Sequence, residues 1–529
     1  MPVHESDVCV IGGGITAALF ARKLSERVPG LKIVILEAGD RLFDLENRFR
    51  NRQRNLAYGE NAWPGDFIED QAANGIVSRT MAVGGSALRW QGHANRFSEE
   101  DLRLRSKYGL AVDWPLEWID LERYYCEAER TIGVSGDPSP HPEDRRSEPY
   151  PMPGMVLTYS LNHIKTWAEQ SGVPFYSCPQ AKNTRDYNGR PACRRCNTCL
   201  SCPIGARYSP DFTYKTLLAS NAIELHDRTL VRKLLLDART PRIVEAQAVN
   251  RGRPAETDSY RAKLFVLASG YTWTPHLLLL SACPRFPNGL ANRSGLVGRY
   301  MTGHPFVTAN IEFDGPFYAG MDEHHPLISR QFFRCPTDRP YARYDIQIFE
   351  SSAGHQPRFK DEGGQLLFGD ALLADWRARA SRAAARVRMY IDSHPDRDSR
   401  LTLDAGTKNS WGDPLPAIEH RLDDATRQRQ AATRQQILDM YNVMSRAGNG
   451  KILSVTDSTY LDHPSGGCRM GVDPAGSVCD SYGRTHDHEN LFVIGSPTLP
   501  TGGCTNSTMT FSALTLRSAD HVAQMLASR

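Results

Sequence analysis

The first forty residues combine an apolar run, a glycine-rich turn and an amphipathic segment. Asp7–Ile11 reads DVCVI, and Gly12-Gly-Gly-Ile-Thr-Ala17 follows it directly. Apolar residues then recur at helical spacing over Ile15–Val28, and a second apolar run, Lys32–Leu36, ends beside Glu37. This order predicts a strand, a turn, a helix and a second strand, which is how a dinucleotide-binding α/β domain begins.

Each part of the turn has a physical role in binding a dinucleotide. Gly12 permits the tight turn, Gly14 lets the backbone approach a pyrophosphate, and the small Ala17 lets helix and strand pack closely. The helix start directs N–H groups at the phosphates. Glu37 can accept hydrogen bonds from ribose hydroxyls, which favours an unphosphorylated ribose over NADP. The alternative is a glycine turn in an unrelated α/β unit, and the pattern does not distinguish NAD from FAD.

Length and composition place the chain among globular proteins of two or three domains. It has 529 residues, of which 40% are hydrophobic and 23% charged. The formal net charge of +3 is too small to predict a nucleic-acid partner or an anionic membrane. No apolar run could span a bilayer, and the first residues lack the basic region of a signal peptide. We therefore expect a cytoplasmic protein, or a periplasmic one exported with a partner that carries the signal.

Four cysteines crowd one loop, CRRCNTCLSCP over 193–203. The other eight cysteines are scattered, so an extracellular disulfide framework is not indicated. Zinc ribbons usually separate two cysteine pairs by a dozen or more residues, and two redox C-x-x-C motifs would overlap here. Iron–sulfur clusters use C-x2-C-x2-C with a further Cys-Pro. The spacing of Cys193, Cys196, Cys199 and Cys202 therefore favours such a cluster over a zinc, disulfide or empty site.

Later segments carry further glycine and strand signals. Gly84-Gly85-Ser86 would let backbone lie against a flat ligand and adds a hydroxyl, although alone it would be a glycine turn. Leu264–Ala268 and Asn490–Gly495 are typical of buried strands, and a helix is predicted over 507–526. The arginine-rich run over 377–388 is expected to be an exposed basic helix.

As a set, these segments resemble the glucose–methanol–choline (GMC) family of FAD oxidoreductases over nearly the whole chain. The resemblance also rests on Gly270-Tyr-Thr-Trp-Thr-Pro-His-Leu-Leu, Val297-Gly-Arg-Tyr-Met-Thr-Gly-His-Pro305, His463-Pro-Ser-Gly-Gly-Cys-Arg-Met-Gly471, Asn490-Leu-Phe-Val and Asn506-Ser-Thr-Met-Thr. It implies an α/β fold, with a Rossmann-like FAD-binding domain of non-contiguous segments and an α+β substrate domain on an antiparallel sheet. We expect the FAD domain at 1–140, 205–305 and 455–529, a cysteine-cluster segment at 141–204 and the substrate domain at 306–454.

The resemblance also implies roles for single residues. His463 matches the catalytic base and Asn506 its partner, which suits an imidazole that titrates near neutral pH and an amide that holds the same hydroxyl. At the position of Arg89 several relatives carry a histidine, in some of them bonded to FAD, so we expect dissociable flavin here. The residues expected to bind FAD are Gly12, Gly14, Ala17, Glu37, Gly84, Gly85, Ser86 and Gly495.

A bacterial branch of the family carries a cysteine cluster before a Cys-Pro-Ile-Gly-Ala segment, which Cys202–Ala206 matches. This branch includes subunits of FAD-dependent glucose dehydrogenase, gluconate dehydrogenase and glucoside 3-dehydrogenase. The likeness implies a 3Fe-4S or 4Fe-4S cluster, a small exporting subunit and a cytochrome acceptor. We expect a dehydrogenase that oxidises a hydroxyl of a sugar or glycoside. The alternatives are a pyranose or glycoside oxidase with a structural cysteine loop, and a non-catalytic subunit for scaffolding or redox sensing.

Overall fold

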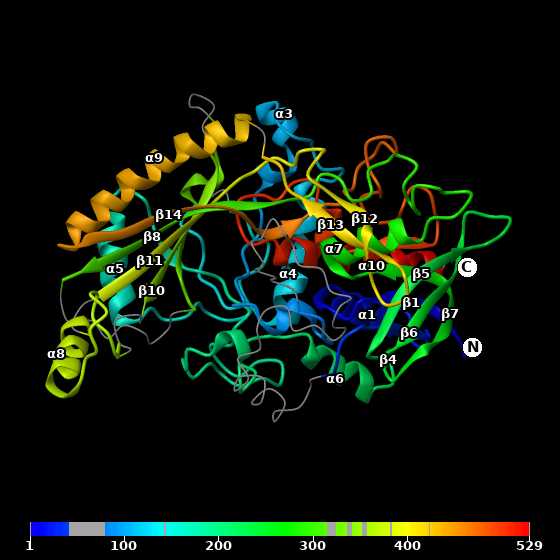
Figure 1. Ribbon diagram of the computed structural model, residues 1–529, viewed down its shortest axis with the longest axis horizontal. Coiled ribbons are helices and arrows are strands. Elements are labelled where there is room, and N and C mark those ends of the chain that lie inside the picture. Colours follow the sequence, from blue (N-terminus) through cyan, green and yellow to red (C-terminus); the bar gives the residue numbers. More distant parts are fainter. Residues whose placement is uncertain are drawn as a thin grey trace.

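The structure, a computed structural model, describes residues 2–41, 80–141, 144–314, 324–335, 341–351, 357–380, 383–422 and 424–527. In this part of the chain two large sheets lie at opposite ends of the molecule (Figure 1). The first has the strand order β4-β2-β1-β7-β6-β5, with β15 paired to β7, and the second the order β14-β8-β11-β10-β9-β3. Both termini lie beside the first sheet (Figure 1).

Strand β1 (Val3–Ile11) lies in the middle of the first sheet. It pairs in parallel with β2 (Ile33–Leu36) on one side and with β7 (Arg253–Leu267) on the other. Helix α1 (Ile15–Arg27) connects β1 to β2. The last four residues of β1 are buried, because a parallel strand is covered on both faces. The predicted order of strand, turn, helix and strand is confirmed.

The carboxyl-terminal prediction is also confirmed. β15 (Leu491–Val493) adds in parallel to β7, and α10 (Thr508–Ala527) follows. The other elements on this side are α4 (Trp118–Ile132), α6 (Asp211–Ala219), β4 (Glu224–His226), β5 (Thr229–Leu236), β6 (Ile243–Asn250), α7 (Gly270–Leu280) and the short helices η2 (Gly85–Leu88), η3 (Glu99–Leu102), α3 (Leu104–Tyr108), η4 (Cys199–Ser201) and η7 (Ser496–Thr498).

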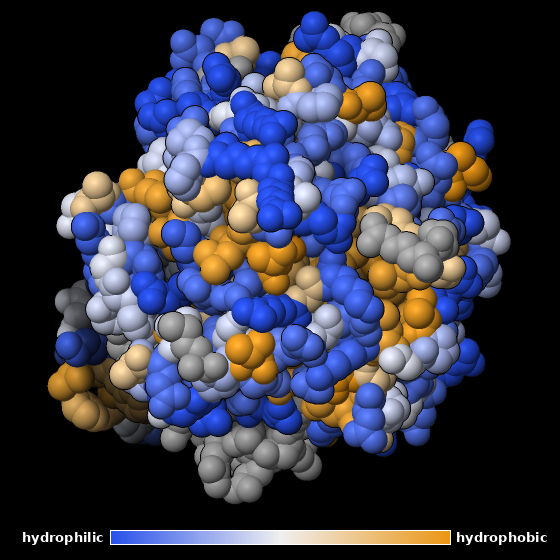
Figure 2. Space-filling view, turned by 90° about the vertical axis from the view of Figure 1, so that its right-hand side faces the viewer, coloured by the Kyte–Doolittle hydropathy of each residue, from blue (hydrophilic) through white to orange (hydrophobic). Residues whose placement is uncertain are grey.

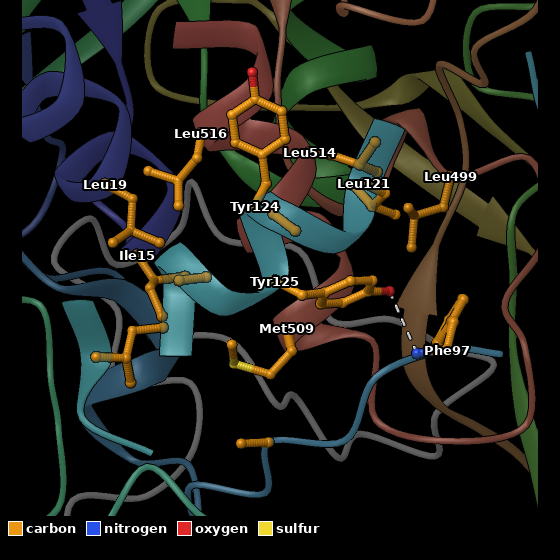
Figure 3. Packing of buried hydrophobic residues seen from close by; sticks show 14 of the residues in the cluster. Ile15, Leu19, Phe97, Leu121, Tyr124, Tyr125, Leu499, Met509, Leu514 and Leu516 are labelled. Carbon is orange, nitrogen blue, oxygen red and sulfur yellow. Dashed lines mark hydrogen bonds between the residues drawn. The ribbon is translucent and has the colours of Figure 1, made fainter. Parts of the chain in front are cut away.

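Helices α1, α4 and α10 share one core. Figure 3 shows Leu19 of α1, Tyr125 of α4 and Met509 of α10 gathered in it. The Tyr125 hydroxyl accepts a hydrogen bond from the backbone N–H of Phe97 at 3.3 Å. The start of α10 is therefore held by apolar packing against helices that come from the other end of the chain.

The second sheet is antiparallel and separates a core face from a polar face. Its strands are β3 (Tyr176–Ser177), β8 (Thr302–Phe313), β9 (Leu327–Ser329), β10 (Tyr344–Ser351), β11 (Ala383–Ile391) and β14 (Lys451–Ser465). Helices α5 (Tyr159–Glu169) and α9 (Asp424–Ala447) pack on one face, where Ile346 and Ile348 are buried. Because strand side chains alternate, Asp345 and Gln347 lie on the opposite face.

One sequence prediction was wrong. The run 377–388 was expected to be an exposed basic helix, but only its first part belongs to α8 (Gly369–Ala380), and its last part belongs to β11 at the centre of the second sheet. Val387 is buried in the core, whereas Arg388 lies on the other face with its guanidinium 4.8 Å from the ring centre of Phe306. The alternation of arginine with apolar residues was a period-two signal.

The domain boundaries stay predictions, and two strands run across them. β8 begins before residue 306 and β14 ends after residue 454, and the two pair with each other. β12 (Arg400–Lys408) and β13 (Pro414–Glu419) form a separate two-stranded sheet that contacts α7. Among the described helices none is long and apolar enough to cross a bilayer. Hydrophilic and apolar residues intermingle on the face shown in Figure 2.

A buried arginine joins the two halves. Arg343, directly before β10, contacts Asp101 of η3 at 2.5 Å and Asp392, directly after β11, at 2.9 Å. None of the three side chains is more than 2% exposed. The guanidinium also donates to the Phe333 carbonyl at 2.7 Å. Removing it would leave two buried carboxylates without their counter-ion.

We predict that Arg343→Met destabilises the protein by about 3–5 kcal/mol, because an uncompensated buried charge is costly. The measurement is the urea midpoint, followed by circular dichroism. Arg421→Met is the control, because the Arg421–Glu419 pair is about half exposed and its loss should leave the midpoint in place. Equal midpoints for Arg343→Met and the unmodified protein would contradict the prediction.

Candidate active site

Two glycine loops that are distant in sequence lie against each other. The backbone N–H of Gly84 donates to the Gly13 carbonyl at 2.8 Å. A Cβ added to Gly85 would lie 3.2 Å from Cα of Gly14, so the backbones are in close approach. The structure therefore brings the predicted loop at Gly84–Ser86 onto the turn between β1 and α1.

The turn itself has the geometry that a pyrophosphate site needs. Gly12 has φ +100°, and a Cβ on it would lie 2.7 Å from the Ala268 carbonyl oxygen, so only glycine fits. Gly14 precedes α1 and supplies no side-chain cap, and a Cβ on it would meet no atom within 4 Å. Open space thus faces the helix start, whose first N–H groups lack intrahelical partners.

Glu37 is held beside this turn. Its carboxylate accepts the backbone N–H of Gly13 at 2.7 Å and that of Gly39 at 2.8 Å. Burial raises its pKa to about 7, against the lowering effect of these hydrogen bonds. Gly495, with φ +94°, approaches the same helix start, since its Cβ would lie 3.2 Å from Cγ2 of Thr16.

The predicted cofactor residues thus converge around the start of α1. Ala17 is fully buried in the core that joins α1 to the sheet, and the Ser86 hydroxyl accepts the backbone N–H of Thr80 at 3.3 Å. The open space at the helix start and the carboxylate of Glu37 fit the pyrophosphate and ribose of FAD. Their individual roles in binding stay predictions.

The two predicted catalytic residues lie in contact. Nε2 of His463, in β14, is 2.6 Å from Nδ2 of Asn506, which lies just before α10. His463 has φ +52°, and the pairing of β14 with β8 shifts register between Asp462 and Ser465. Such a bulge redirects a side chain. The structure therefore brings together an imidazole and an amide that lie 43 residues apart in the chain.

A third residue sets the proton position on His463. Nε2 of His304, in β8, is 3.0 Å from the Gly502 carbonyl oxygen, and its Nδ1 is 3.0 Å from Nδ1 of His463. A carbonyl only accepts, so a neutral His304 carries its proton on Nε2 and accepts at Nδ1. His463 then donates from Nδ1. Its Nε2 keeps the lone pair that a general base needs, and this atom faces Asn506.

The orientation of the Asn506 amide is fixed from the other side. Its Oδ1 accepts from Nε2 of Gln347 at 3.0 Å. The same Gln347 nitrogen donates to Oδ2 of Asp345 at 2.9 Å, and Thr505 donates to that oxygen at 2.8 Å. Because Oδ1 is engaged, Nδ2 of Asn506 turns to His463.

Sequence reasoning missed His304, Asp345 and Gln347 as parts of this site. His304 lies in the Val297–Pro305 stretch, but the sequence could not show that it contacts His463. Asp345 and Gln347 alternate with isoleucines in YDIQIF, which is a period-two signal of a strand with one polar face. That signal was available and was not used.

The cysteine loop does not form the expected ligand set in this structure. Cys199 and Cys202 are buried and Cys193 is half-buried, whereas Cys196 is exposed and lies 2.9 Å from the Thr198 hydroxyl. Among the described residues, no three His, Cys, Asp or Glu side chains are placed to hold a metal ion. The residues on both sides of Cys196 have positive φ, 51° and 54°, and turn the chain there. This conformation does not fit an iron–sulfur cluster.

Comparison with known proteins identifies the family. Models described as GMC oxidoreductase match residues 164–306 and 395–515. The fructose dehydrogenase large subunit of Gluconobacter japonicus is 31% identical over 549 residues, which cover 98% of each chain. The chain belongs to the GMC oxidoreductase family. It is an FAD-dependent oxidoreductase that acts on CH–OH groups, as the sequence predicted.

A second relative and a solved structure extend the comparison. The 6'''-hydroxyparomomycin C oxidase of Streptomyces lividus is 28% identical over 548 residues, 99% of this chain and 92% of that protein. The crystal structure of pyridoxine 4-oxidase from Mesorbium loti matches with a TM-score of 0.64 at 15% identity, over 98% of this chain and 99% of that one. The predicted GMC fold class is thereby confirmed.

We predict that His304→Phe slows flavin reduction by substrate about tenfold or more, because His463 loses the acceptor that holds its proton on Nδ1. The limiting rate and its pH profile, measured by anaerobic rapid mixing, should change while FAD content stays the same. His276→Phe is the matched control. His276 lies in α7, and its Nε2 also contacts a carbonyl oxygen, that of Pro414, at 2.9 Å. An equal effect of both substitutions would refute a positioning role.

The raised pKa of Asp345 predicts that the stability of the protein depends on pH. Burial raises its pKa to about 7, above the unfolded value, against its hydrogen bonds from Thr505 and Gln347. The folded state therefore binds the extra proton, and this stabilisation is present at low pH and lost as pH rises through about 7. Between about pH 5 and 8 the melting temperature of the unmodified protein should fall relative to Asp345→Asn. Asp424→Asn, at a side chain 90% exposed, is the control; parallel curves would contradict the prediction.

Proposed function

We propose that this enzyme is a dehydrogenase whose substrate is a sugar or glycoside. The observation that supports a polyhydroxylated substrate is the Oε1 atom of Gln347. Gln347 is fully buried, and its Nε2 is engaged by Asn506 and Asp345, which makes Oε1 an acceptor. Oε1 has no hydrogen-bond partner among the described residues. An unmet buried acceptor costs about 1–3 kcal/mol, and a hydroxyl next to the one oxidised would satisfy it.

The chemistry at the catalytic pair follows from its atoms. The substrate hydroxyl replaces the Asn506 N–H at Nε2 of His463, which then takes its proton, and Nδ2 of Asn506 donates to the same hydroxyl oxygen and orients the carbon. FAD, when bound, supplies the acceptor for the hydride from that carbon. Gln347 and His304 hold the two groups in position. One relative is named a fructose dehydrogenase, and a sugar substrate of that kind agrees with the proposed substrate class.

The electron acceptor is the second part of the proposal. The Gluconobacter japonicus relative, at 31% identity, is named a dehydrogenase, which favours an electron acceptor other than oxygen. The Streptomyces lividus relative is named an oxidase, which favours oxygen as the alternative acceptor. Four further predictions depend on the sequence alone: the iron–sulfur cluster, the exporting subunit, the cytochrome acceptor and the cellular compartment. Since the described cysteines do not form a metal-holding group, no electron step through them is derived.

Anaerobic mixing with neutral sugars should bleach the bound flavin, and turnover with a dye should exceed hydrogen peroxide formation in air. His463→Ala should keep FAD and slow reduction at least about a hundredfold, the usual effect of losing a general base. His276→Phe again serves as the control for a buried histidine.

Four results would each remove a different part of this proposal. Peroxide formed as fast as reduced dye would make the enzyme an oxidase. Reduction by simple alcohols but by no sugar would remove the substrate class. Retention of FAD without reduction by any sugar or polyol would favour a non-catalytic subunit. Unchanged flavin reduction in His463→Ala would contradict the assignment of His463 as the base.

An iron and acid-labile sulfide assay on anaerobically purified protein tests the cluster. If the spacing of the four cysteines is meaningful, about three or four iron atoms per FAD are expected. Cys199→Ser should abolish them, whereas Cys283→Ser, a half-buried cysteine outside the loop, should not. A bare flavin spectrum without iron would leave the loop as a structural element.

A further inference from the structure

Two extended segments next to the catalytic pair form a short ribbon. His93 and Gln180 are antiparallel bridge partners. The backbone N–H of Ala94 donates to the Pro179 carbonyl at 2.8 Å, and that of Ala181 to the Gly92 carbonyl at 2.7 Å. Side chains of directly opposed residues in such a pair lie on one face with Cβ atoms about 5 Å apart. His93 and Gln180 therefore project together.

This ribbon borders the active site. Asn95, two residues beyond His93, donates to the Thr505 hydroxyl at 3.1 Å, next to Asn506. The His93 ring centre is 5.9 Å from that of Phe349, which lies on the same face of β10 as Gln347. His463 is one of the charged neighbours that lower the pKa of His93. The Asn95–Thr505 hydrogen bond and the His93–Phe349 ring contact thus place the pair beside the candidate active site.

Both side chains carry a buried polar atom without a partner. His93 is 5% exposed and Gln180 is fully buried. Nε2 of His93 and Oε1 of Gln180 have no hydrogen-bond partner among the described residues. Nε2 of Gln180 donates to the His324 carbonyl at 2.7 Å, which identifies Oε1 as the acceptor. Two neighbouring unmet atoms indicate a ligand, since native structures leave few such groups unpaired.

We propose that His93 and Gln180 together bind a second hydroxyl of the substrate, distinct from the one assigned to Gln347. This inference rests on the proposed sugar substrate. A hydroxyl can donate to Oε1 of Gln180 and at the same time pair with Nε2 of His93. A carboxylate or phosphate only accepts and would leave Oε1 unmet. The pair therefore selects a neutral hydroxyl, and the substrate is a neutral sugar or glycoside at this position.

The charge state of the histidine agrees with a neutral ligand. Burial lowers the pKa of His93 to about 3, and the nearby groups His463 and Lys182 act in the same direction. The imidazole is thus neutral at ordinary pH and provides a dipole instead of a positive charge. A neutral ring with its proton on Nε2 donates to the hydroxyl oxygen while the hydroxyl donates to Oε1 of Gln180, whereas it gives an anionic substituent no ion pair.

The test uses the FAD-loaded enzyme, the neutral sugar that reduces it fastest and the single-deoxy derivatives of that sugar. One derivative should bind the unmodified enzyme at least about tenfold more weakly, because it leaves both Oε1 of Gln180 and Nε2 of His93 unpaired. His93→Phe and Gln180→Met should weaken binding of the parent sugar by a similar factor. They should not weaken binding of that one derivative further. His93→Gln, which restores a polar atom near Nε2, should recover most of the affinity.

Ser160→Ala is the matched control, because its hydroxyl is also buried and has no partner in the described part of the chain, but lies in α5, on the other face of the second sheet. Equal losses for the parent and all deoxy derivatives would overturn the inference. So would a changed flavin spectrum or FAD affinity with unchanged sugar binding, which would assign the pair to the flavin. Tight binding of a derivative with a carboxylate at that position would also overturn it. If no neutral sugar reduces the unmodified enzyme, the proposed function fails first, before any variant is compared.

Discussion

The hydrogen-bond chain from the Gly502 carbonyl through His304 and His463 to Asn506 and Gln347 determines what the active site can do. Each bond fixes the direction of the next, because the Gly502 carbonyl at one end and the ionised form of Asp345 at the other only accept. The result is an imidazole nitrogen with its lone pair turned to an amide N–H. Substitution of His304 would change the proton position on His463 without removing a group that is proposed to contact the substrate.

This hydrogen-bond chain forms because three parts of the fold meet. β8 and β14 supply the two histidines, β10 supplies Gln347, and the start of α10 supplies Asn506. The sheet has a core face of isoleucine and valine against α5 and α9, so its opposite face is free for polar side chains. The apolar core under α10 holds the helix that follows Asn506 (Figure 3). Arg343 joins the same sheet to η3 through two buried carboxylates.

The two substrate-binding proposals use one physical argument. Buried polar atoms without partners are rare in native proteins, and here Gln347, His93 and Gln180 each carry one near the catalytic pair. Two of these atoms are amide oxygens whose orientation is fixed by the bonds of their own nitrogens. Such acceptors need hydrogen-bond donors. Both proposals therefore predict that hydroxyl groups bind at the site and that anions do not. The cysteine cluster stays a prediction from spacing, because the described side chains of the loop do not form a metal-holding group.

The sequence by itself determined the dinucleotide turn and the buried strands of the first sheet, whereas His463 and Asn506 became candidates through the resemblance to the GMC family. The turn and the strands depend on local chemistry: glycines where a Cβ would collide, apolar runs of strand length, and an acid at the end of the second strand. Only the tertiary structure decided that His304, Asp345 and Gln347 support the pair, and that 383–391 is a central strand and no helix. The contacts of His304 with His463 and of Gln347 with Asn506 join residues 159 positions apart. They depend on strand register and side-chain direction, which no local pattern specifies.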